Sequence, residues 1–155
     1  MEIICPTPAP ANILGSELYY SWRADDFVSR FTDREMPGYY LQYGDKYVQR
    51  FLYQTRPMLS EPGQCWLDRV LLFLQEFMEE KLMQLPSIEL DHEEFTQFAF
   101  DSHIIAYQSA GFKNLPLHDL LIIAFTPDIK DLFHQYGRRQ LIELWKEYAV
   151  DHVNI

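Results

Sequence analysis

Prolines and glycines divide the second half of the chain into short intervals, and apolar residues recur within these intervals at helical spacing. The breaks fall at Pro62, Pro86, Gly111, Pro116 and Gly137. Proline lacks the N–H that a helix interior or a sheet ladder needs, and glycine readily ends a helix, so each interval folds as a separate element. We therefore predict a mainly α protein, a single-domain bundle of about six or seven helices.

The clearest helix is predicted at residues 65–84, after a loop marked by Pro57, Pro62 and Gly63. Its apolar face is wide, which is typical of a central helix that packs on two sides. That face consists of Leu67, Val70, Leu71, Leu74, Phe77 and Met78.

The helices that follow have recognisable ends. Asp91, with Glu94 three residues later, forms an aspartate version of the capping box and begins a helix that Gly111 ends. Pro116 opens an apolar segment at residues 117–125, for which we favour a buried helix over a buried strand. Two more helices are predicted, at residues 126–137 and 138–150.

Residues 25–31 and 45–51 resemble each other, since both begin with Asp and share an aromatic residue, Val, Arg and Phe at the same positions. In each, the Asp is expected to cap an amphipathic helix. Residues 39–53 also admit a short β-hairpin, because aromatic residues alternate around a Gly44-Asp45 turn. We favour the helix, since residues 25–31 have helical spacing.

The first fifteen residues form a proline-rich N-terminal arm, and residues 16–155 are expected to form one helical domain. Pro6, Pro8 and Pro10 alternate with small residues, which favours an extended backbone. A polyproline ligand is the functional alternative. No basic residue flanks these prolines, so we favour an arm draped over the surface.

Acidic residues are concentrated in residues 61–101, which contain ten Asp and Glu residues and two Lys and Arg residues. This stretch contributes −8 to the formal net charge of −10 at pH 7. A field of this sign attracts basic surfaces and disfavours direct contact with nucleic-acid phosphates or anionic lipid. Five glutamates outside the predicted apolar faces are the candidate partner-binding residues: Glu76, Glu79, Glu80, Glu93 and Glu94.

These features predict a small acidic cytoplasmic protein that binds and regulates a protein partner with a basic surface, as inhibitors, immunity proteins and adaptors do. The ten tyrosines and eleven phenylalanines are expected mainly in the core, with the remaining tyrosines as contact area. We expect no membrane contact, no cofactor and no catalytic residue. The sequence leaves homo-oligomerisation open.

The start of the chain, its apolar runs and its two cysteines indicate a protein of a reducing compartment. The chain begins Met-Glu-Ile-Ile-Cys-Pro, with an acid where a signal peptide has a base, and apolar runs such as residues 70–74 are too short to cross a bilayer. Cys5 and Cys65 lie in no Cys-x-x-Cys motif, so we expect reduced thiols.

One alternative function is enzymatic. His118-Asp119 is similar to the adjacent His-Asp pair of a family of helical metal-dependent phosphohydrolases, in which a distant upstream His and a later Asp complete the metal site. The similarity covers these two residues and the helical background. It implies His92 or His103 as the upstream ligand, and the later ligand would be Asp131 or Asp151.

Overall fold

The computed structural model describes residues 4–125 and, beyond them, residues 139, 142–143, 146 and 148–150. Within this part of the chain the structure is mainly helical and contains no strand, so the predicted mainly α fold is confirmed. The predicted helix at residues 126–137 lies outside the described residues. The α-helices are α1 (Tyr19–Arg30), α2 (Lys46–Arg50), α3 (Glu61–Gln84), α4 (His92–Ser109) and α5 (Leu117–Phe125).

Residues 39–58 form one nearly continuous helical rod. Two π-helical segments, Tyr39–Asp45 and Phe51–Thr55, flank α2, and a short 3-10 turn, Arg56–Met58, follows them. The helical interpretation of residues 39–53 is therefore confirmed, and the hairpin alternative is wrong. Gly44 lets this rod lie against α1, because a Cβ at that position would come within 2.5 Å of the Tyr20 ring.

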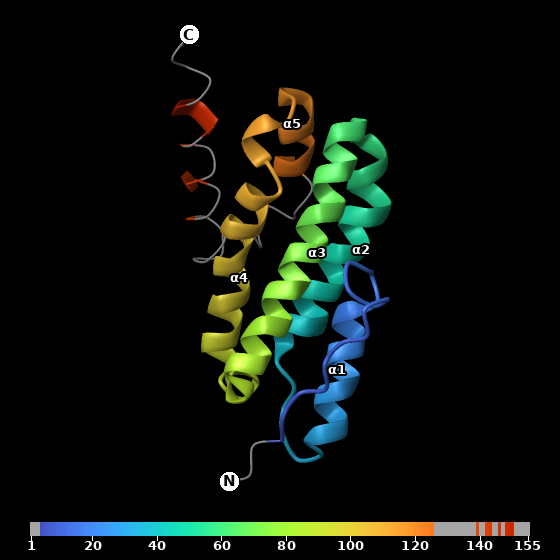
Figure 1. The fold of residues 1–155 in the computed structure, drawn as a ribbon, viewed down its shortest axis with the longest axis vertical. Helices are drawn as coiled ribbons and strands as arrows, with labels where there is room; N and C mark the ends of the chain where they lie inside the picture. The colour runs from blue at the N-terminus through green and yellow to red at the C-terminus, as the bar shows by residue number, and fades with distance from the viewer. Residues whose placement is uncertain (1–3, 126–138, 140–141, 144–145, 147, 151–155) are drawn as a thin grey trace.

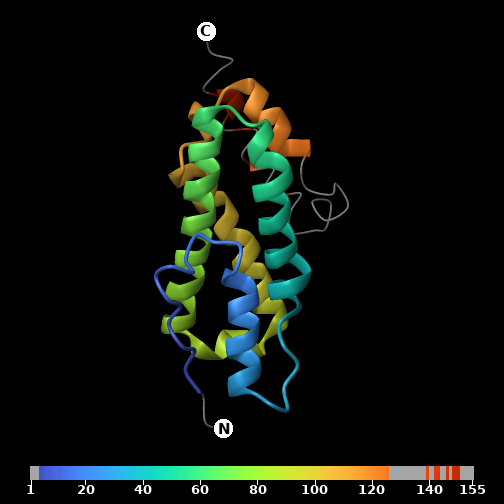
Figure 2. The ribbon, with the colours of Figure 1, turned by 90° about the vertical axis from the view of Figure 1, so that its right-hand side faces the viewer.

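The long helices run roughly side by side. Figures 1 and 2 show α3, α4 and the rod of residues 39–58 packed around one another, with α5 lying across one end of the bundle. Helix α1 packs against the π-helical segment Tyr39–Asp45 at the other end. A 3-10 segment, Pro86–Leu90, makes the turn between α3 and α4.

The ends of α4 are confirmed. The Asp91 side chain caps the helix by accepting a 2.9 Å hydrogen bond from the Glu94 backbone N–H. Gly111, with a φ of 94°, adopts the left-handed conformation that commonly follows a helix.

The predicted starts of two other helices are wrong. Helix α1 begins at Tyr19, so Asp25 lies exposed in mid-helix and caps nothing. Helix α3 begins at Glu61, because the Ser60 side chain caps it and Pro62 fits the first turn, where its missing N–H costs nothing. Pro62 therefore belongs to this helix and not to a loop.

The core is aromatic. Its fully enclosed side chains include Tyr19, Tyr40, Phe27, Phe95 and Trp66. Helix α5 contributes only one face, since Leu120 and Ile123 are buried while Leu117, Leu121 and Phe125 are exposed. The expectation of a buried helix thus holds for one side of α5.

Candidate functional site

Four of the five candidate glutamates have exposed side chains. Glu76 and Glu80 lie on the outer face of α3, and Glu93 and Glu94 lie in the first turn of α4. Within the described residues none of the four makes an ion pair, and Glu80 accepts only a hydrogen bond from the neutral Gln84 side chain, at 3.0 Å. Their negative charge is therefore not compensated in that part of the molecule.

Glu79 has a different environment, and the expectation that it is exposed is wrong. One carboxylate oxygen accepts a 2.6 Å hydrogen bond from the Tyr19 hydroxyl and lies 3.1 Å from Arg23 Nε. The other accepts a 2.8 Å hydrogen bond from the backbone N–H of Ala9. Burial, and then the Glu79 charge, raise the pKa of Tyr19 well above its ordinary value, so this phenol remains a donor.

Glu79 belongs to a buried ionic cluster that we did not predict. Arg30 donates to Asp26 through Nε and to Glu89 through Nη2, both at 2.8 Å. The Tyr40 hydroxyl donates to the second oxygen of Glu89 at 2.6 Å, and Glu89 is fully enclosed. With Arg23 and Glu79, the cluster contains two cations and three anions, which join α1 to α3 and to the turn before α4. Pairing of this kind is what lets charges be buried at all.

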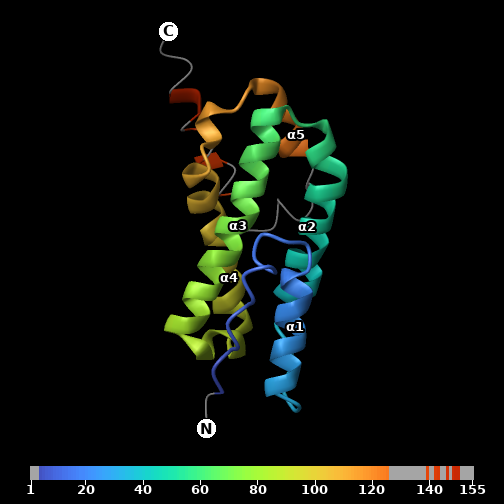
Figure 3. The same cartoon turned by 45° about the vertical axis from the view of Figure 1, so that its right-hand side comes forward.

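The same cluster holds the N-terminal arm. The Arg23 Nη2 group donates to the carbonyl of Thr7, and the Thr7 N–H donates to Asp26 at 3.4 Å. Further along, the buried Gln75 side chain accepts from the Gly15 N–H at 2.6 Å and donates to the Ser16 carbonyl at 3.0 Å. Figure 3 shows the arm running between α1 and α3. The contacts hold this arm in one place on the surface.

Half-buried phenylalanines lie on the same two helices, α3 and α4, as the exposed acids. Phe73 and Phe77 stack with ring centroids 6.4 Å apart, and Lys81 places its ammonium 5.4 Å from the Phe98 ring across the α3–α4 interface. All three phenylalanines are half-buried. This surface of the α3–α4 hairpin thus combines apolar area with an excess of carboxylates.

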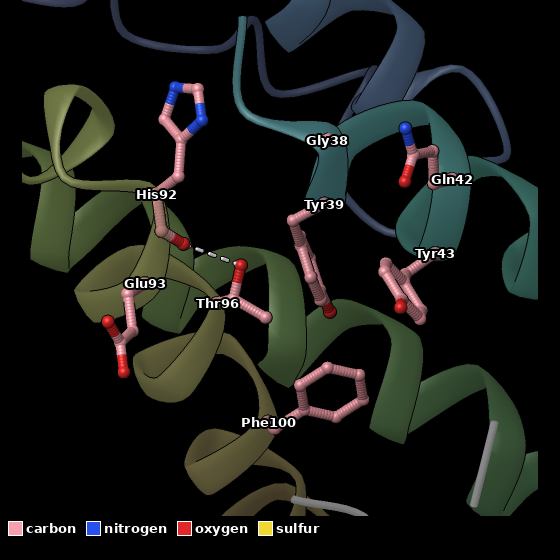
Figure 4. Close-up of a pocket in the computed structure, with 8 residues that line it drawn as sticks. All are labelled: Gly38, Tyr39, Gln42, Tyr43, His92, Glu93, Thr96 and Phe100. Atoms are coloured by element: carbon pink, nitrogen blue, oxygen red, sulfur yellow. Dashed lines mark hydrogen bonds between the residues drawn. The ribbon is translucent and has the colours of Figure 1, made fainter. Parts of the chain in front are cut away.

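A cavity of about 330 Å³ lies beside the first turns of α4. The π-helical segment Tyr39–Asp45 provides one side and α4 the other, so residues about fifty positions apart meet here. The lining residues are Gly38, Tyr39, Gln42, Tyr43, His92, Glu93, Thr96 and Phe100. Figure 4 shows the three aromatic rings grouped on one side, with His92, Glu93 and Thr96 on the other.

The rings of this cavity are packed against one another. Phe100 is perpendicular to Tyr43 at 5.5 Å and to Tyr39 at 5.8 Å, and the two tyrosines are nearly parallel at 6.1 Å. Tyr39 also meets Phe95 edge-on in the core behind the cavity. Burial raises the pKa of Tyr39 well above its ordinary value, so its ring is uncharged. A wall of this type suits an apolar or cationic group.

His118 and Asp119 occupy unlike environments. Asp119 is fully enclosed, and its carboxylate accepts hydrogen bonds from the Ser60 backbone N–H at 2.9 Å and from the Ser60 hydroxyl. His118 is exposed, with Nε2 3.3 Å from the Met58 carbonyl oxygen. Asp119 therefore has a structural role, since it holds Ser60, the cap of α3, to α5.

The metal site implied by the phosphohydrolase resemblance is not assembled in the part of the chain that the structure describes. No three His, Cys, Asp or Glu side chains there are grouped so that they could hold a metal ion. Asp131 and Asp151 lie outside the described residues. Cys5 and Cys65 are both exposed and unpaired.

None of the described helices has both the length and the apolar character that crossing a bilayer requires. Comparison with protein-family models, with curated proteins and with solved structures finds no match.

Proposed function

We propose that the protein binds another protein with a basic surface, through the exposed carboxylates of the α3–α4 hairpin. The observation that supports this most strongly is the division among the acids. Glu89, which is fully enclosed, and Glu79, whose side chain is 16% exposed, have cationic partners, whereas Glu76, Glu93 and Glu94 have none among the described residues. The ion pairs of Glu79 and Glu89 give these two residues a role in the folded structure. In the part of the chain that the structure describes, Glu76, Glu93 and Glu94 have no structural role beyond solubility.

In this proposal the exposed carboxylates act mainly on the rate of association with the partner. Uncompensated charge on one surface accelerates encounter with an oppositely charged partner by roughly 10- to 1,000-fold, and salt screens the effect. The half-buried rings of Phe73, Phe77 and Phe98 would then supply the apolar contact that slows dissociation. By covering a basic surface, the protein would block anionic ligands of its partner, which is how an inhibitor, immunity protein or adaptor of this type would regulate.

The partner-binding set is accordingly Glu76, Glu80, Glu93 and Glu94. Glu79 is left out, because its two oxygens already accept hydrogen bonds within the molecule. Reversal of Glu79 would place a second cation beside Arg23 and would test folding instead of binding.

A pull-down at low and at high salt tests the proposal, with the intact protein as bait in a lysate of the cells that produce it. Recovered proteins are identified by mass spectrometry, and the bait is compared with a Glu76→Lys/Glu80→Lys variant. We expect one basic protein to be recovered by the native bait, less at high salt and much less by the variant.

The matched control is Asp25→Lys/Asp33→Lys, which changes the net charge equally at two exposed acids outside α3 and α4. This control should recover the partner as the native bait does. Equal losses with both variants would show that only overall charge matters, and unchanged recovery with both would reject the acidic surface as a docking site.

A further inference from the structure

We infer that the aromatic cavity beside α4 receives a cationic side chain, lysine or arginine, from the basic partner. This inference rests on the proposed function and assigns that function a specific pocket. Its volume of about 330 Å³ is at the lower end of the range for small-ligand sites, which suits one side chain.

The walls of the cavity match the stem of such a side chain. Lysine and arginine carry apolar methylene groups that pack well on aromatic rings, and their charged ends are attracted to ring faces by about 0.5–1 kcal/mol at exposed sites. Tyr43 and Phe100, which are partly exposed, present a surface fixed by their contacts with each other and with the buried Tyr39 ring. A fixed surface loses little conformational entropy on binding.

The polar lining identifies the charge of the ligand. The Thr96 hydroxyl donates to the His92 carbonyl at 2.7 Å, and the His92 ring lies 3.0 Å from the Glu35 carbonyl oxygen. Glu93 makes no hydrogen bond or ion pair within the described residues, so its carboxylate is free to receive a cation. Figure 4 shows this carboxylate at the edge of the cavity, on the far side of Thr96 from the rings, where it would repel an anionic ligand.

The α4 N-terminus does not reverse this preference. A helix N-terminus carries roughly half a positive charge, which by itself disfavours a cation. Asp91, Glu93 and Glu94 place three carboxylates in and just before the first turn, so the local field is negative. Glu93 is stabilised there in the free protein and is available when a partner docks.

Small cations test the pocket without a partner. We would titrate the protein with n-butylammonium, n-butylguanidinium and the neutral analogue 1-butanol, following backbone amide shifts of Tyr43, Glu93 and Thr96 by NMR. We expect saturable shifts with at least one cation and much weaker binding of butanol. The cation that binds more tightly indicates whether lysine or arginine is the natural occupant. Equal binding of butanol, or no saturable shift at these amides, would overturn the inference.

Two variants and a neighbouring control sharpen the test. Glu93→Gln should weaken cation binding about three- to five-fold, the effect of one partly exposed ion pair. Tyr43→Leu should weaken it about three-fold while keeping an apolar wall. Glu94→Gln removes the same charge one residue later and outside the lining, so it should change binding far less. An equal loss in Glu94→Gln would reduce the pocket to a general field effect and overturn the inference.

The two proposals can fail separately. If Glu76→Lys/Glu80→Lys abolishes partner recovery while Tyr43→Leu leaves the partner dissociation rate unchanged, the acidic surface stands and the pocket assignment is overturned. Faster dissociation of the partner from Tyr43→Leu and Glu93→Gln, with well-dispersed NMR spectra for both, supports the pocket.

Discussion

At the scale of single residues, Asp119 shows how a charge can be used for structure alone. Its enclosed carboxylate holds the backbone and side chain of Ser60, and Ser60 in turn caps α3 by accepting from the Gly63 N–H. A side chain at Gly63 would collide with this carboxylate, since an added Cβ would lie 2.5 Å from Asp119 Oδ2. The three residues thus join the ends of two helices.

Replacement of Asp119 should therefore cost stability. We expect Asp119→Ala to lower the free energy of unfolding by about 3 kcal/mol, because two buried donors lose a charged acceptor. His118→Ala, an exposed neighbour, should cost less than about 1 kcal/mol. Urea denaturation followed by circular dichroism measures both, and a nearly neutral Asp119→Ala would reject the structural role.

His103 is the residue whose protonation should report on the fold. Burial lowers the pKa of His103 from its ordinary value of 6.5, and its ring stacks on Phe100. The unfolded chain therefore binds this proton more readily, so stability is full above about pH 6.5 and declines as the pH falls through the lower pKa of the folded state.

NMR titration of the His103 ring should give a pKa below 6.5. The loss of stability between about pH 7 and about pH 5 should be smaller in His103→Phe, which cannot be protonated. An imidazole that titrates at or above its ordinary pKa, or an unchanged pH dependence in the variant, would contradict the burial of this ring.

At the scale of elements, the ionic cluster fastens α1 to the α3–α4 turn. Arg30 is its best-connected cation, and its side chain is 6% exposed. Arg30→Ala should lower the free energy of unfolding by about 3–5 kcal/mol, since Glu89 would remain buried without its cation and Asp26 would keep only Arg23, at 3.6 Å. Thermal and urea unfolding measure the change.

Arg56→Ala is the matched comparison. Arg56 lies 2.9 Å from Asp68, close to the 2.8 Å between Arg30 and Glu89, but the side chains of Arg56 and Asp68 are both exposed. Exposed pairs contribute about 0–1 kcal/mol, so this variant should remain close to the native protein. Similar losses for the two variants would mean that the cluster is not shielded from solvent.

The same elements show which features could be predicted from the sequence. The ends of α4 depend on local signals, the Asp91 cap and Gly111, and were predicted well. The start of α1 was missed because two buried charges, Arg23 and Asp26, interrupt its apolar face. Charged residues count as surface in any periodicity argument unless their partners are known.

The residues of the candidate site likewise differ in whether local sequence signals are enough to predict them. Helical spacing was enough to predict the exposure of Glu76, Glu80, Glu93 and Glu94. It was wrong for Glu79, whose partner Tyr19 lies sixty positions away in the sequence. The aromatic cavity was not predicted, because it forms only when the segment Tyr39–Asp45 packs beside α4.

At the scale of the whole molecule, the acids of residues 61–101 fall into two groups. One group enters the interior, where it meets arginines of α1 and fastens the arm. The other stays on the α3–α4 hairpin beside half-buried phenylalanines, with Lys81 as a nearby cation. We propose that this distribution gives the molecule a directed field, and directed fields act mainly on association rates.

The association rate of the recovered partner, measured at several ionic strengths, tests this account most directly. For the native protein the rate constant should fall steeply as salt increases. For Glu76→Lys/Glu80→Lys it should be about ten-fold lower at low salt and converge with the native value at high salt, while Asp25→Lys/Asp33→Lys stays close to native throughout. Native, hairpin and control proteins that share one rate constant at low salt would contradict a docking surface on the α3–α4 hairpin.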